Sequence, residues 1–221
     1  FLPNASGAVF GIAAADSGLG FQGHYALDEQ WGVMGLISDA NASRFDFGDP
    51  LEGDVFGGLE LQWRSPESAA LSTLAKLGAA GTTGTKDGLP AIGASGTSGW
   101  GISALLEQEL APDGRPVIIL RYARGFDEAA IYDEQLGAQF ILYQPAGFAR
   151  FDSDALGLGF NYVDPVADTD ARDEYNFEVF YRFPIFPQVD LTANYQYIID
   201  PAFTTEFDDA HVFGLRITTT F

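Results

Sequence analysis

The sequence predicts an all-β protein, and more narrowly a transmembrane antiparallel β-barrel. From Asp173 to Phe221, three consecutive runs alternate apolar and polar side chains with the two-residue period of a strand. The composition, with 26 Gly, 19 Phe and 9 Tyr, favours strands and turns over surface helices. No window reaches the roughly 18 uninterrupted apolar residues that a spanning helix needs. A membrane protein with this sequence would therefore cross the bilayer with strands.

The final run, 212–221, shows this alternation most clearly. One strand face carries Phe213, Leu215, Ile217, Thr219 and Phe221, and the other carries Val212, Gly214, Arg216, Thr218 and Thr220. In a soluble sandwich the apolar face would be the core. In a membrane barrel, lipid covers the apolar face and water in the lumen contacts the polar one. The runs at 174–183 and 190–197 repeat the same division.

The rest of the chain divides into strands joined by turns and loops. The expected strands are 8–15, 19–27, 31–39, 59–64, 69–77, 99–109, 116–125, 132–143, 154–163 and 174–183, followed by the two final runs. The segment 69–77 fits a strand or two helical turns, and the strand is preferred here. Loops are expected at 40–56 and 78–98, the second because it is rich in Gly, Thr and Ser and has no periodicity. The sequence thus predicts about 11 or 12 strands in a single domain, 1–221.

The C-terminal runs resemble the carbohydrate-selective (OprB-type) porin family. The resemblance is carried by EVFYR at 178–182, NYQYIIDP at 194–201 and DDAHVFGLR at 208–216, and by the terminal Phe221. Upstream, DALGLGF at 154–160 is similar to a family strand that follows a loop bearing Arg and Asp. The similarity is strongest over the C-terminal third and looser back to Phe1.

This resemblance implies a passive pore for small sugars or other neutral solutes in the outer membrane of Gram-negative bacteria. Family members have about sixteen strands, so the chain is expected to lack an N-terminal portion of the barrel. The alternatives are a split porin, in which a second chain supplies the other strands, and a complete short barrel of twelve strands. The resemblance also implies a homo-oligomer, a trimer, with outer-membrane lipid as a partner and no cofactor. The apolar run at 8–15 is the expected packing surface. Phe221 is expected to act as the signal for assembly.

Polar positions on the predicted strands are candidates for lining the lumen. They are Glu60, Arg64, Glu107, Arg121, Asn161, Glu178, Arg182, Asn194, Gln196 and Arg216. Sugar hydroxyls both donate and accept hydrogen bonds, and these side chains offer both kinds of partner. Phe180 interrupts the polar face of its strand and could stack on a sugar ring. The alternative is that Arg and Glu pair across strands and hold the wall together. Fixed lumen charges of both signs predict weak ion selectivity.

Several other features limit the possible functions. The net charge of -20 argues against a nucleic-acid partner, because binding a polyanion requires cationic side chains. Nothing resembles a catalytic motif, so an enzyme is not expected. An acidic loop with Asp168, Asp170 and Asp173 could ligate calcium, although a solvated loop is the simpler interpretation. Tyr and Trp residues fit interfacial aromatic girdles, namely Tyr143, Tyr162, Tyr175, Tyr195, Tyr197, Trp31, Trp63 and Trp100. The alternatives to a pore are a soluble or surface-attached ligand-binding β-sandwich and a barrel serving as an anchor or adhesion platform.

Overall fold

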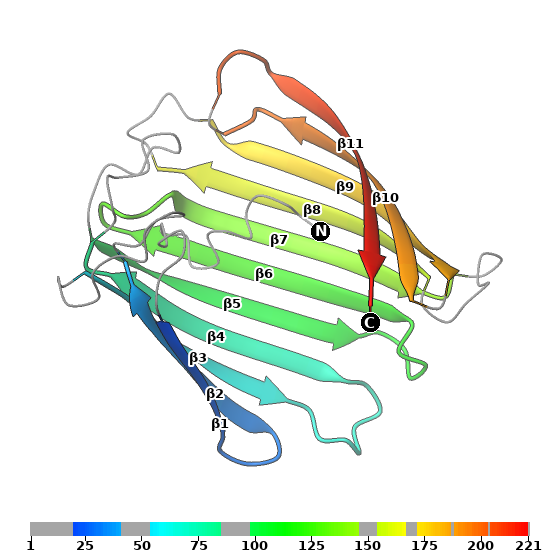
Figure 1. The fold of residues 1–221 in the computed structure, drawn as a ribbon, viewed down its shortest axis with the longest axis horizontal. Coiled ribbons are helices and arrows are strands. Elements are labelled where there is room, and N and C mark those ends of the chain that lie inside the picture. The colour runs from blue at the N-terminus through cyan, green and yellow to red at the C-terminus, as the bar shows by residue number, and fades with distance from the viewer. Residues whose placement is uncertain are drawn as a thin grey trace.

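The computed structural model describes residues 20–40, 54–84, 98–145, 154–166, 172–186, 188–202 and 204–220. Eleven strands form one antiparallel sheet in which each strand pairs with its neighbours along the chain (Figure 1). They are β1 (Gly20–Ala26), β2 (Trp31–Asp39), β3 (Val55–Arg64), β4 (Thr73–Thr82), β5 (Gly99–Glu109), β6 (Pro116–Phe126), β7 (Tyr132–Tyr143), β8 (Ala155–Pro165), β9 (Glu174–Phe186), β10 (Val189–Ile199) and β11 (Asp209–Thr219). The predicted all-β fold is confirmed. None of the described residues belongs to a helix long and apolar enough to cross a membrane.

The sheet is twisted and curved, with β1 and β11 as its two edges (Figure 1). In antiparallel strands, residues directly opposite each other share a face. The register joins Glu60 to Gly78, Gly78 to Ser103, Ser103 to Ala123, and Ala123 to Gln135. The registration continues through the other strand pairs, with register shifts at Tyr132–Glu134 and Val189–Asp190, so residues outside these shifts can be assigned to one of two faces.

We call the face that includes Glu60 and Gln135 the polar face. We call the opposite face, which includes Leu59, Leu61 and Leu136, the apolar face. On the apolar face, large hydrophobic side chains are open to the surroundings, with Phe21 77% and Phe213 81% exposed. All the described strands belong to one sheet, so no second sheet packs on this face as it would in a sandwich. The apolar face therefore requires lipid or a partner rather than a protein core.

Aromatic rings gather near both ends of the strands on the apolar face. Near the start of β2 and the end of β3, the rings of Trp31 and Trp63 lie 6.5 Å apart. At the opposite end, Trp100 stacks on Phe126 with ring centroids 4.1 Å apart. This placement is typical of the girdles that flank the hydrocarbon layer. Tyr143 was wrongly expected among them, because it pairs with Ala155 on the polar face.

The two ends of the sheet differ in their connections. We call the end at which β2, β4, β6, β8 and β10 finish the long-loop end, because the connections there include 40–54 and 83–98. The other end, which we call the short-turn end, includes the connections 27–30 and 187–188 together with longer ones at 65–72 and 144–154. Within the described strands, the Asp, Glu, Lys and Arg side chains assigned to the apolar face occur only near the long-loop end. They are Asp39, Arg124, Glu134, Asp164 and Asp209.

The expected bounds of two strands were wrong. β3 begins at Val55, inside the expected loop 40–56, and β4 runs from Thr73 to Thr82 instead of from 69 to 77. The end of β4 contains Gly78, Ala79, Ala80 and Gly81, whose small side chains carry no period. Pairing with β3 and β5 on both sides keeps this segment extended. The expected strand at 8–15 and the terminal Phe221 lie outside the described residues.

Candidate functional site

The polar face carries a belt of hydrogen-bonding side chains that crosses the middle of the sheet. The belt is built from adjacent rows of paired residues. One row contains Gln62, Lys76, Arg121, Gly137, Asn161 and Asn176, and the next contains Arg64, Glu107, Ile119, Gln139, Glu178 and Gln196. All ten residues selected from the sequence lie on this face, including Arg182, Asn194 and Arg216 toward β11. Their role in lining a lumen stays a prediction.

At β9 and β10 the polar side chains of the belt are hydrogen-bonded to one another. The carboxylate of Glu178, which is 5% exposed, accepts a hydrogen bond from Asn194 Nδ2 at 2.9 Å. Gln196 Nε2 donates to the same oxygen at 3.3 Å. These contacts arise because Gln196 is paired directly with Glu178 across the two strands, and Asn194 lies diagonally. This part of the belt holds two strands together, although through Asn and Gln rather than through the Arg–Glu pairs of the wall-pairing alternative.

A second interaction joins β3 to β4. Lys76 Nζ lies 3.1 Å from Glu60 Oε1, and Gln62 Nε2 donates to that oxygen at 2.6 Å. Lys76 was missed in the sequence because its segment fitted a helix as well as a strand. In a strand, Leu74 would share the face of Lys76 and Leu77 would lie on the opposite face, so the segment showed no clear apolar face. Pairing with Gln62 places Lys76 on the polar face.

Between these two interactions, a cavity of about 280 Å³ opens on the polar face. Hydrophobic side chains of Leu105, Ile119 and Ala123 line one part of it. The polar lining consists of Glu60, Lys76, Ser103, Arg121, Gln135, Gln139 and Asn161. Gly137 lies between Arg121 and Asn161: a Cβ there would be 3.6 Å from Arg121 Cβ and 3.4 Å from Asn161 Oδ1. The missing side chain keeps the cavity open at its centre.

The polar groups around this cavity are incompletely paired. Gln135 Nε2 donates weakly to Asn161 Oδ1 at 3.4 Å. Within the described part of the chain, Arg121 forms no ion pair and the side chain of Gln139 makes no hydrogen bond. Donors and acceptors are therefore available to a solute here, unlike at Glu178.

Phe180 does not provide the expected stacking surface. Its side chain is only 8% exposed and lies against Gly157 of β8, where a Cβ would collide with the ring. The pairing of Gly157 with Phe180 across β8 and β9 explains this position. The ring therefore fills the wall and is not presented to a passing solute.

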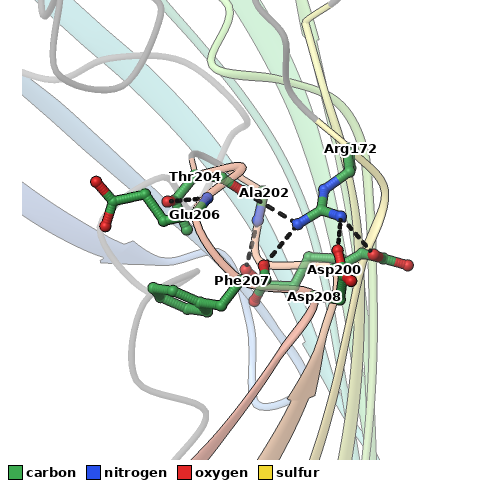
Figure 2. A network of polar contacts seen from close by, with 8 residues as sticks. Arg172, Asp200, Ala202, Thr204, Glu206, Phe207 and Asp208 are labelled. Carbon is green, nitrogen blue, oxygen red and sulfur yellow. Dashed lines mark hydrogen bonds and ion pairs between the residues drawn. The ribbon is translucent and has the colours of Figure 1, made fainter.

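A cluster at the long-loop end was also missed in the sequence. Figure 2 shows Arg172 reaching the connection between β10 and β11. Its Nη1 atom lies 2.8 Å from Asp208 Oδ1 and 2.9 Å from Asp200 Oδ1. Its Nη2 atom donates to the carbonyl oxygens of Phe207 at 2.7 Å and Thr204 at 3.2 Å. A single guanidinium thus binds four acceptors and fixes this loop. Its residues lie in neighbouring loops, a proximity that the linear sequence does not reveal.

The suggested calcium loop gains no support. Asp168 and Asp170 lie outside the described residues, and Asp173 accepts a hydrogen bond from the hydroxyl of Tyr162 at 3.2 Å. Among the residues that the structure describes, no group of three or more His, Asp or Glu side chains is placed to hold a metal ion.

One curved antiparallel sheet, exposed and apolar on one face and polar on the other, defines the wall of a membrane β-barrel. The family model "Carbohydrate-selective porin, OprB family" matches residues 4–221, so the chain belongs to this family of outer-membrane proteins. A solved structure described as "High pH structure of Pseudomonas putida OprB" is similar, with a TM-score of 0.72 and 19% sequence identity. The match covers 96% of this chain and 61% of that chain. Comparison with curated proteins gives no match.

Proposed function

We propose that the chain forms part of an outer-membrane pore through which small neutral sugars diffuse passively. The observation that supports this most strongly is the polar belt, interrupted only by Leu74, Leu105, Ile119 and two glycines, on the face opposite the exposed hydrophobic side chains. Water and solute would contact the belt, and lipid would contact the other face. Passive diffusion needs no chemistry from the protein beyond weak, exchangeable hydrogen bonds along the path.

The proposal includes further strands beyond the eleven described. A strand can cross the bilayer only if its backbone groups are paired, so the edges at β1 and β11 must be covered. In an antiparallel sheet with an odd number of strands, the first and last run in the same direction. Closing the barrel with antiparallel pairs alone therefore requires at least one more strand. We propose a barrel of about sixteen strands, the number that the family resemblance implied, assembled as a trimer.

The charges on the polar face support a pore for neutral solutes. The cations on the described strands are Arg64, Lys76, Arg121, Arg182 and Arg216, and the anions are Glu60, Glu107, Glu109, Glu174, Glu178 and Asp190. The two signs are nearly balanced, although the net charge of the chain is -20. Most of the excess negative charge therefore lies away from this wall.

Reconstitution tests the proposal directly. The purified full-length protein that contains these strands should produce ion conductance in planar bilayers, and glucose should reduce the current by occupying the path. Proteoliposomes should swell in isotonic glucose but not in isotonic stachyose, which is too large to follow it. If the protein inserts stably but gives neither conductance nor swelling, it is an anchor or adhesion platform and the pore proposal is wrong.

A further inference from the structure

Within the proposed pore, the cavity between β3 and β8 has properties that the rest of the polar belt lacks. Its volume of about 280 Å³ lies at the lower limit of small-molecule pockets. This volume suits one small ring rather than an oligosaccharide. All the residues that line it belong to strands, so the paired backbones of six neighbouring strands hold its shape.

The lining of the cavity has two kinds of surface. Leu105 and Ile119 present hydrocarbon, whereas Arg121, Gln139 and Asn161 present hydrogen-bonding groups around it. A pyranose ring has the matching division, with apolar C–H groups on its faces and hydroxyl groups around its edge. A simple ion or a flexible polar chain would leave the hydrocarbon surface without a partner.

The polar groups in this cavity are also unsaturated. Arg121 can present all its N–H donors, and the amide of Gln139 offers one acceptor and two donors, because neither side chain is paired within the described residues. Only 7% of Gln139 is exposed, but its amide atoms are not among the fully buried ones, so the amide can be reached from the cavity. A group of this kind gains free energy when a solute hydroxyl completes its hydrogen bonds.

We infer that this cavity is a binding subsite for a single neutral pyranose ring. Arg121 and Gln139 bind the hydroxyl groups, and Leu105 and Ile119 lie beneath one face of the ring. This inference rests on the proposed pore and names where within it a sugar pauses. The nearby cation Lys76 is held by Glu60 at 3.1 Å, so the free positive charge at the cavity belongs to Arg121.

The concentration of glucose that halves the current through the reconstituted protein provides the test. Removing one hydrogen-bonding group with Gln139→Leu, or the donors with Arg121→Met, should raise that concentration about 3- to 10-fold, the equivalent of one lost hydrogen bond. Gly137→Ala keeps every polar group but adds a methyl between Arg121 and Asn161, so it should also weaken the block.

Matched controls lie outside the belt. Gln22→Leu on β1 and Arg115→Met in the connection between β5 and β6 make the same chemical changes away from the cavity, and each should leave half-block by glucose unchanged. The reversal potential of each variant, measured across a salt gradient, separates loss of charge from loss of sugar contact. The amount of heat-resistant folded barrel on a gel checks that each variant assembles.

The outcomes distinguish the subsite from the pore. If the unmodified protein does not conduct, the proposed function fails. If it conducts and glucose blocks it, but the three cavity variants behave like the controls, the pore stands and the subsite is overturned. Stronger block by gluconate than by glucose, abolished by Arg121→Met, would also overturn the inference, because Arg121 would then be an anion site.

Discussion

Glu178 and Arg121 lie on the same face of the sheet, in adjacent rows of the polar belt, yet they differ in how completely they are paired. Glu178 is buried and accepts hydrogen bonds from Asn194 and Gln196. Arg121 is exposed and has no ion pair within the described residues. The presence of a charge does not explain the difference, since both residues carry charged side chains on the same face of the sheet. The neighbouring strand decides it: Glu178 is paired with Gln196, and Arg121 is paired with Leu105 and Gly137.

The difference teaches that saturation of hydrogen bonds, rather than polarity, separates structural from solute-binding residues on this wall. A saturated group has little left to offer a solute, and breaking its contacts mainly affects stability. An unsaturated group contributes little to stability but is available to a sugar hydroxyl. Substitutions in the two regions should therefore have opposite signatures.

The largest expected effect is on stability, at Glu178. Glu178→Ala would leave the amides of Asn194 and Gln196 without their acceptor, at a cost of about 1–3 kcal/mol for each buried group left unpaired. The temperature at which the folded barrel is lost on a gel should fall, while half-block by glucose stays unchanged in the barrels that assemble. Glu178→Gln retains an acceptor oxygen and should recover much of the loss. A wild-type melting temperature for Glu178→Ala would contradict the assignment.

An intermediate effect is expected at Arg172, a saturated group located in a loop. Arg172→Lys keeps the charge but cannot reach four acceptors with a planar fork, so the connection between β10 and β11 should open more often. The backbone amide of Asp200 donates to the carbonyl oxygen of Asp208 at 2.7 Å, and its hydrogen exchange should accelerate. Arg115→Lys is a suitable control, because among the described residues the Arg115 side chain makes only an exposed ion pair with Asp113 at 3.6 Å. Equal exchange in both variants would refute this account of the loop.

The smallest expected effect concerns ion selectivity. Loop carboxylates more than about 8 Å from the path are largely screened at physiological salt, so the nearly balanced wall should determine the reversal potential. We expect weak selectivity despite the acidic chain, with a modest shift toward cations in Arg121→Met. Measurements across a salt gradient provide the check. Strong cation selectivity of the unmodified protein would mean that the loops, rather than the polar face, dominate the field.

Much of the fold could be predicted from the sequence, because alternation identifies both a strand and its two faces. The expected strands 31–39, 99–109 and 132–143 coincide with β2, β5 and β7. Prediction failed at 78–82, where small residues such as Gly78 and Ala80 give no period. There, pairing with neighbouring strands determines the structure, and the local sequence alone does not.

The candidate site was less predictable. Alternation assigned Arg121 and Glu178 to one face but could not tell them apart, since pairing depends on register between segments separated along the chain. Gln135 and Gln139 were overlooked, although their alternation with Leu136 and Ala138 in 132–143 indicates that both lie on the polar face. The expected assembly role of Phe221 and the oligomer contact at 8–15 stay predictions, as both lie outside the described residues.

The consecutive order of the strands has a consequence for how the chain folds. Every pairing from β1 to β11 joins segments adjacent in the chain, so each hairpin can form without waiting for a remote partner. Only the closure that joins the two edges would bring distant segments together, at a larger loss of chain entropy. We therefore expect the inner hairpins to gain protection in pulse-labelled hydrogen exchange before β1 and β11 do, so that the ring closes last.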